Sequence, residues 1–162
     1  MEVLTARRLV EAGVRFVTVR APGSNPLSKS YDWDDHAVNW DMRDSMLGRL
    51  PKYDQIVTTL IEDLHDRGLA EKVLLVVTGE FGRTPMNEVR RGNTPGKEGR
   101  DHHPFAFTML LAGGGIQGGQ IVGETDELGY HPTKDPIHVH DLQATILHCL
   151  GMDHEQLTFR HQ

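Results

Sequence analysis

The sequence predicts an α/β fold, chiefly because helical and strand patterns alternate along the chain. An amphipathic pattern typical of a helix covers 39–67, and apolar runs typical of buried strands cover 73–77 and 105–111. Strands separated by helices usually form a parallel sheet with right-handed crossovers. Ligands bind such sheets at the carboxyl ends of the strands, so polar residues that follow a strand are candidate site residues.

The first part of the chain is expected to contain a helix, a strand, a loop and the long helix. Residues 4–12 have the pattern of a short helix that Gly13 ends. Residues 14–19 alternate and are rich in β-branched side chains, which predicts a strand. A loop rich in Pro, Gly, Ser and Asn follows over 21–31. Pro51 is expected to begin the second segment of the long helix.

Beyond the two apolar runs, a surface loop is expected over 86–99 and a last helix over 140–150. Asp141 can favour the N-terminus of that helix. Residues 112–119 hold five glycines and are similar to a phosphate-binding loop, but the Lys-Ser/Thr ending is missing. A tight backbone turn is therefore the preferred interpretation.

Composition limits the classes of function. A chain of 162 residues suits one domain, taken here as 1–162. The net charge of −6 argues against a nucleic-acid or anionic-membrane binder. No apolar run is long enough to span a bilayer, and the first residues lack the apolar stretch of a signal peptide. The only cysteine, Cys149, excludes an internal disulfide, and a buried structural thiol is preferred over a catalytic one.

Three clusters of acidic residues and histidines stand out, each beside an expected strand. They are Asp32-Trp33-Asp34-Asp35-His36, Gly79-Glu80-Phe81-Gly82-Arg83-Thr84-Pro85 and Gly99-Arg100-Asp101-His102-His103-Pro104. Carboxylates and imidazoles are the ligands that divalent metal sites use. Together the clusters favour a metallohydrolase.

In the first cluster, two spacings could present a carboxylate and an imidazole to one ion. Asp32 and His36 are four apart and share a helix face, whereas Asp34 and His36 are two apart and share a strand face. The alternative is a polar turn in which Asp34 or Asp35 caps the next helix.

The other two clusters also leave alternatives open. Glu80 is a metal ligand, a general base or the ion-pair partner of Arg83, and Arg83 is a candidate anion clamp because its fork matches phosphate, sulfate or carboxylate oxygens. Asp101 and one of the two histidines are candidate ligands. His102 and His103 point to opposite sides of an extended chain, so both are not expected to bind one ion. A solvated histidine pair is the alternative.

These motifs resemble a bacterial family called DUF1501, a family of unknown function within the alkaline phosphatase and sulfatase superfamily. The matching runs are Trp33-Asp34-Asp35-His36, 61–69, 79–85, 99–104, 110–116 and 141–146. The resemblance covers nearly the whole chain and implies a three-layer α/β/α sandwich, present in part. It places 1–162 with the C-terminal part of a longer protein and suggests an exported one.

The superfamily resemblance implies a two-metal site that hydrolyses phosphate or sulfate esters, with zinc first and manganese, calcium or magnesium as alternatives. Its substrate would be a small anionic ester or a sulfated saccharide. By that resemblance Asp34 (or Asp32), His36 and His102 hold one ion, Glu80 holds or bridges the second, and Asp101 is a further ligand. Arg83 would be the oxyanion clamp.

Departures from the family pattern support a second hypothesis. Phe81 stands where the superfamily has the histidine of an Asp-His pair, and His103 stands where the family often has Trp. The N-terminal metal carboxylate and the nucleophile are expected in a missing N-terminal half. The alternative is thus a non-catalytic binding or structural domain. A truncated sheet exposes an edge, so a homo-oligomer is also expected.

Overall fold

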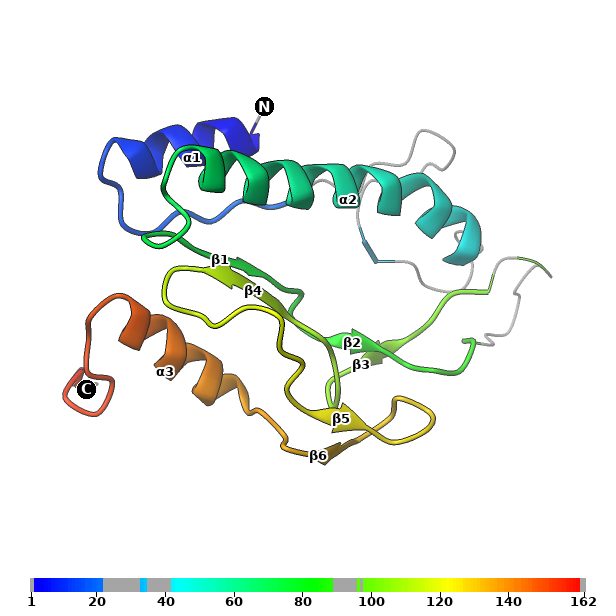
Figure 1. The fold of residues 1–162 in the computed structure, drawn as a ribbon. Coiled ribbons are helices and arrows are strands. Elements are labelled where there is room, and N and C mark those ends of the chain that lie inside the picture. The colour runs from blue at the N-terminus through cyan, green and yellow to red at the C-terminus, as the bar shows by residue number, and fades with distance from the viewer. Residues whose placement is uncertain (1, 22–32, 35–41, 89–95, 97, 161–162) are drawn as a thin grey trace. The chain divides into compact units, whose positions relative to one another are not determined.

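A computed structural model describes residues 2–21, 33–34, 42–88, 96 and 98–160. These residues form a mixed α/β fold with three helices and three two-stranded sheets (Figure 1). The chain divides into two compact units. Unit 1 comprises Met1–Asp63 and Met86–Asp101, and unit 2 comprises Leu64–Pro85 and His102–Gln162.

The expected first helix is confirmed as α1 (Glu2–Glu11). The negative charge of Glu2 in its first turn interacts favourably with the positive end of the helix dipole. None of its residues is buried. Arg7 holds α1 in unit 1, because its guanidinium lies 2.6 Å from Glu11 and 3.1 Å from Asp63 of the long helix.

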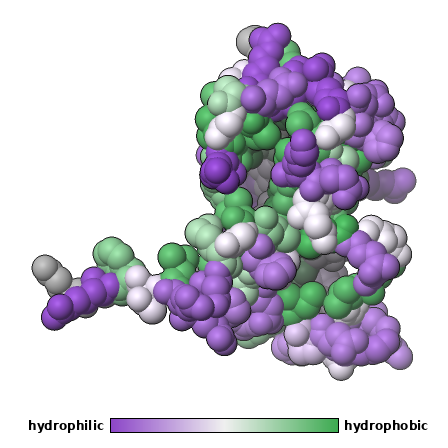
Figure 2. All heavy atoms as spheres, turned by 60° about the vertical axis from the view of Figure 1, so that its left-hand side comes forward, coloured by the Kyte–Doolittle hydropathy of each residue, from purple (hydrophilic) through white to green (hydrophobic). Residues whose placement is uncertain are grey.

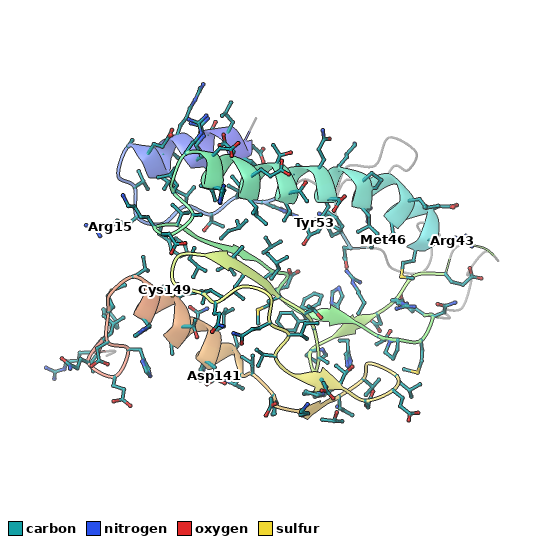
Figure 3. The ribbon with its side chains drawn as sticks, in the orientation of Figure 1. Arg15, Arg43, Met46, Tyr53, Asp141 and Cys149 are labelled. Atoms are coloured by element: carbon teal, nitrogen blue, oxygen red, sulfur yellow. The ribbon has the colours of Figure 1, made fainter. Side chains whose placement is uncertain are left out.

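The long helix is confirmed as α2 (Met42–Asp66), which continues through Pro51 rather than starting a new segment there. Pro51 has no N–H, so one hydrogen bond of the helix is missing at this turn. Ser45 and Arg49 lie one turn apart and are both buried. The Arg49 guanidinium lies 5.7 Å from the ring centroid of Trp33, which meets Tyr53 edge-on at 6.1 Å (Figure 3 labels Tyr53).

In the part of the chain that the structure describes, unit 2 holds all the strands and the last helix. They are β1 (Leu74–Val77), β2 (Gly82–Arg83), β3 (His102–His103), β4 (Leu110–Gly113), β5 (Glu124–Thr125), β6 (Pro132–Lys134) and α3 (Val139–Cys149). β1 pairs with β4, β2 with β3 and β5 with β6, each pair antiparallel. The short β5–β6 pair carries an ion pair of 2.6 Å between Lys134 and Glu124.

The prediction of a parallel sheet is wrong for the described strands, which pair antiparallel. Parallel neighbours need a crossover, usually a helix, between them. Every helix of the described residues lies before β1 or after β6, so β1 and β4 are joined by a chain that returns in the opposite direction. The described residues accordingly form no three-layer sandwich.

Two expected strands also need correction. The run 73–77 is confirmed as β1, but 14–19 contains no strand, and the strand expected at 105–111 begins only at Leu110. Alternating and apolar patterns indicate extended backbone. A strand additionally requires a neighbour to pair with, and among the described residues 14–19 and 105–109 have none.

The glycine-rich segment after β4 is a tight turn, as expected, that packs against the beginning of β1. The Gly114 N–H donates to the Ala70 carbonyl at 2.8 Å, and Gly114 has a φ of +52°. A Cβ at this position would lie 2.5 Å from the backbone nitrogen of Leu74. Only glycine therefore fits here.

The last helix is confirmed as α3, and a capping box begins it. The Asp141 carboxylate accepts from the His138 N–H at 2.7 Å, and His138 Nδ1 accepts from the His140 N–H at 3.2 Å. Asp141 and Cys149 lie at opposite ends of the helix (Figure 3). Cys149 is half-buried and forms no disulfide.

Few apolar side chains are fully buried. Among the described residues, Leu64 and Leu142 are the buried apolar ones, while Ile121 is 96% exposed and Phe159 88% exposed. Apolar residues are accordingly visible between polar ones on the surface (Figure 2). The residues of strands β1 and β4 are mostly half-buried, so part of their apolar surface remains exposed.

Candidate functional site

The second and third sequence clusters meet in the β2–β3 pair. Gly82 lies opposite His103, and Arg83 lies opposite His102. Directly opposite residues of an antiparallel pair project from the same face, and successive residues project from opposite faces. Arg83 and His102 therefore share one face, and His103 belongs to the other.

The Arg83–His102 face is organised by a phenylalanine. The rings of Phe81 and His102 lie with centroids 4.0 Å apart and tilted by 37°. The Arg83 guanidinium carbon lies 5.9 Å from the Phe81 ring centroid. Arg83 is half-buried and His102 is exposed. One face thus presents a guanidinium and an imidazole, two groups that can donate hydrogen bonds to oxyanions.

On the opposite face, His103 is buried at 1% exposure. Its Nε2 lies 2.6 Å from the Tyr130 carbonyl oxygen, so this nitrogen carries the proton and donates. Its ring packs at 4.5 Å from the Tyr130 ring and 5.5 Å from Phe105. His103 accordingly ties β3 to the segment before β6, a supporting role different from that of His102.

Asp126 shapes the segment that receives His103. Its carboxylate accepts backbone N–H bonds from Tyr130 at 2.7 Å, His131 at 2.9 Å and Leu128 at 3.1 Å. The bond from Tyr130 is the main cause that lowers the pKa of Asp126, and desolvation opposes it. The ionised carboxylate thereby fixes the backbone whose carbonyl holds His103.

Gly82 is required for the same arrangement. A Cβ at Gly82 would collide with the Ala106 carbonyl oxygen, so a larger residue would push β2 away from the chain that follows β3. The close backbone approach keeps Phe81 and Arg83, on either side of Gly82, in place.

The remaining predicted site residues are dispersed. Glu80 is exposed in unit 2, and within the described ranges its carboxylate makes no hydrogen bond or ion pair, so it is not the partner of Arg83. Asp34 and Asp101 are exposed and belong to unit 1. Asp32 and His36 lie outside the described residues. Within the described ranges, no three His, Cys, Asp or Glu side chains gather closely enough to hold a metal ion.

Sequence reasoning missed Asp126 and Tyr130. Asp126 carries a recognisable signal, because an aspartate followed three residues later by Gly129 is typical of a turn that bonds its own backbone. Tyr130 contacts His103 through its backbone carbonyl and its ring, and the residue type alone does not predict that role. The sequence marks Phe81 only as a departure from the histidine of the superfamily pattern, and not as the ring that contacts His102 and Arg83.

The described helices include none that is both long and apolar enough to cross a membrane. No curated protein and no solved structure gives a significant match to the chain. A family model described as a protein of unknown function, DUF1501, matches residues 1–162. Because that match covers the whole chain, the protein belongs to the DUF1501 family.

Proposed function

We propose that this DUF1501 protein is a metal-dependent hydrolase-like domain for phosphate or sulfate esters, and that Arg83 and His102 hold the oxyanion of the ester. The observation that carries this proposal is the direct cross-strand pairing of Arg83 with His102 beside the ring of Phe81. A guanidinium fork donates two parallel hydrogen bonds to a tetrahedral oxyanion, and an imidazole supplies a further donor.

Arg83 and His102 would act most strongly when negative charge increases on the ester oxygens. Donors fixed before the reaction stabilise such charge without reorganising. The Phe81 ring contacts the His102 imidazole on one side, and the Arg83 guanidinium lies over the same ring. The proposed substrate is a small anionic ester or a sulfated saccharide, which could reach this face because His102 is exposed to solvent.

A divalent ion is part of the proposal, zinc first, with manganese, calcium or magnesium as alternatives. Its proposed ligands are Asp32, Asp34, His36, Glu80, Asp101 and His102. The described residues do not by themselves supply a complete ligand set, because no three metal-binding side chains gather among them. The chemistry assigned above therefore belongs to Arg83 and His102.

The three-layer α/β/α sandwich is likewise a proposal. Its support is the composition of β1, whose four residues Leu74, Leu75, Val76 and Val77 are all apolar, as in strands that are covered on both faces. In this proposal β1 is an inner strand of a larger sheet.

A binding domain without turnover is the second candidate, and Phe81 favours it. Its ring occupies the position beside His102 where a second imidazole would be needed for a metal. The same Arg83–His102 face would then hold a phosphate or sulfate group without cleaving its ester.

Titration calorimetry with inorganic sulfate and phosphate tests anion binding at the Arg83–His102 face, which both candidate functions require. The unaltered protein is expected to bind, and Arg83→Ala is expected to weaken binding about tenfold, the loss of one charge-assisted contact. Arg160→Ala, an exposed arginine elsewhere in unit 2, is the matched control and is expected to bind normally. Equal anion affinities of the Arg83→Ala and Arg160→Ala variants would rule out Arg83 as part of the binding site.

Turnover separates the two candidates. Chromogenic aryl phosphate and aryl sulfate are incubated with the protein and each divalent ion. Hydrolysis that both Arg83→Ala and His102→Ala abolish supports the hydrolase. Anion binding without hydrolysis under any ion supports the binding domain.

A further inference from the structure

One peptide group links Asp126 to the buried imidazole of His103. The N–H of the peptide between Tyr130 and His131 donates to Asp126 Oδ2 at 2.9 Å. The carbonyl oxygen of the same peptide lies 2.6 Å from His103 Nε2 and accepts its proton. A trans peptide is planar and directs its N–H and its carbonyl to opposite sides, so both ends can be bonded at once. A continuous chain of two hydrogen bonds therefore runs from the carboxylate to the imidazole.

The negative charge of Asp126 strengthens this chain. Backbone hydrogen bonds, that of Tyr130 first, lower the pKa of Asp126, so its carboxylate is ionised near neutral pH. A hydrogen bond to an ionised acceptor is stronger than a neutral one, and successive hydrogen bonds polarise one another. The carboxylate therefore makes the Tyr130 carbonyl a better acceptor for His103. The His103 end of the chain is buried, where hydrogen bonds are electrostatically stronger than in water.

The imidazole of His103 in turn determines where the strand that carries His102 lies. β3 contains only these two residues, and their side chains project from opposite faces. In the two-stranded pair, His103 lies opposite Gly82 and His102 lies opposite Arg83. An isolated pair of two short strands is marginally stable, so the buried ring is an important anchor of β3. A displaced His103 ring would move His102 relative to Arg83 and to the ring of Phe81.

We propose that Asp126 is a positioning residue for the Arg83–His102 face, and that it acts through the Tyr130–His131 peptide and the His103 ring. Among the described residues, the Asp126 carboxylate bonds only to backbone N–H groups of its own turn, 128–131. Its effect on an anion therefore passes along this chain. The effect on the anion rests on the proposed function, whereas the link from Asp126 to His102 does not.

Asp126→Asn breaks the chain and keeps most of the turn. The carboxamide oxygen can replace Oδ1, which accepts from the N–H groups of Leu128 at 3.1 Å and Tyr130 at 2.7 Å. The carboxamide NH2 then replaces Oδ2, and it cannot accept from the His131 N–H. Asp153→Asn is the matched control, because it removes the same charge. Asp153 also accepts from a backbone N–H, at 3.0 Å, in a turn of unit 2 with no described bond to β3.

Proton NMR of the histidine rings tests the chain without an anion. The Nε2–H of His103 is buried and hydrogen-bonded, so a downfield resonance that exchanges slowly is expected. In Asp126→Asn it is expected to move upfield and to exchange faster. The ring protons of His102 lie beside Phe81, at 4.0 Å between centroids, and their ring-current shift is expected to shrink. The buffer contains a chelator, because His102 is a proposed metal ligand. Resonances that change no more than in Asp153→Asn would overturn the proposal.

A pair of variants tests the other end of the chain. His103→Gln retains an N–H donor that can reach the Tyr130 carbonyl, whereas His103→Leu has none. Circular dichroism identifies the folded variants. The ring-current shift of His102 is expected to be retained better in His103→Gln than in His103→Leu. Equal shifts in the two variants would mean that the bond to the Tyr130 carbonyl does not position His102.

Sulfate binding, measured by calorimetry, connects the chain to the candidate site. Asp126→Asn is expected to weaken binding about threefold or more relative to Asp153→Asn. Loss of a negative charge by itself would favour an anion, so weaker binding cannot result from the charge. A role in stability alone would lower Tm and leave the sulfate affinity of the folded variant unchanged, which would overturn the proposal. If the unaltered protein binds no sulfate, the proposed function fails, and the ring resonances still decide whether Asp126 positions His102.

Discussion

His103 Nε2 donates a hydrogen bond of 2.6 Å to the Tyr130 carbonyl oxygen, and this bond joins β3 to the segment before β6. The donor ring is buried and packs on Tyr130 and Phe105. His102, the next residue along the chain, belongs to the opposite face of β3. His103, which supports the candidate site, and His102, a proposed donor in that site, are therefore adjacent residues with different environments.

Replacing His103 by alanine is expected to lower the free energy of unfolding by about 2–4 kcal/mol, because a buried ring is lost and a carbonyl is left without its donor. Urea unfolding followed by circular dichroism measures the change. His65→Ala is the control, since the His65 side chain is 82% exposed. A similar stability for both variants would mean that the His103–Tyr130 contact is dispensable.

Asp126 makes stability depend on pH in the acid range. Backbone N–H donors, that of Tyr130 first, lower its pKa in the folded chain. A lowered pKa stabilises the folded state above the unfolded-state pKa, and the stabilisation is lost as pH falls through the folded-state pKa. The difference in unfolding free energy between the unaltered protein and Asp126→Asn is expected to be constant near neutral pH and to shrink below about pH 4. A difference that does not change between pH 6 and pH 3 would contradict this linkage.

Gly114→Ala is expected to destabilise the protein by about 2 kcal/mol or more, because the new Cβ meets the Leu74 backbone and the positive φ is strained. Two controls separate these effects. Gly115 has a φ of +96° with no atom near its Cβ, so alanine there adds strain alone. Gly118 has open space and no positive φ, so alanine there is expected to be near neutral. Thermal unfolding should order the losses as Gly114, Gly115, Gly118, and any other order would argue against the collision.

Asp141→Ala removes one of the two side-chain acceptors of the capping box that begins α3, the carboxylate that accepts from the His138 N–H. A loss of about 1 kcal/mol in the free energy of unfolding is expected, as for other N-terminal caps. Chemical denaturation measures it, with Gln143→Ala as the control on the same helix. If both variants lose equally, the Asp141–His138 bond does not stabilise the helix.

Phe81→His tests whether the ring beside His102 is what limits metal binding. Since the two rings lie 4.0 Å apart, the substitution places a second imidazole next to the first. Zinc affinity, measured by calorimetry, is expected to rise about tenfold or more, the contribution of one added ligand. Phe81→Leu, which adds no ligand, should show no gain. Equal affinities in the two variants would indicate that His102 is not a metal ligand.

The helices could be predicted from the sequence, because amphipathic spacing and local stop signals determine them. The pattern of 73–77 also identified β1 correctly. Strand pairing could not be predicted, because it depends on which segment lies alongside. Residues 14–19 have a better alternating pattern than 82–83, yet only Gly82–Arg83 has a partner.

The residues of the candidate site could be named from the sequence, but their arrangement could not, and their chemical roles stay predictions. Residue type and position made Arg83 a candidate anion clamp and one of the two histidines a candidate ligand, and the family resemblance selected His102 over His103. Their cross-strand pairing results from the Gly82–His103 register, to which the close approach of Gly82 to Ala106 contributes. Of the three alternatives for Glu80, the ion pair with Arg83 does not form among the described residues, because a short sequence distance does not fix where two side chains point.

The three strand pairs of unit 2 do not merge into one sheet, and this separation has a kinetic consequence. Each pair has its own small set of backbone hydrogen bonds, so each can open while the others remain closed. The ladder that carries Arg83 and His102 has two residue pairs, whereas β1–β4 has four. Amide hydrogens at Arg83 and His102 should therefore exchange with solvent sooner than those of β1, and the two side chains proposed to bind the anion can separate and meet again without global unfolding.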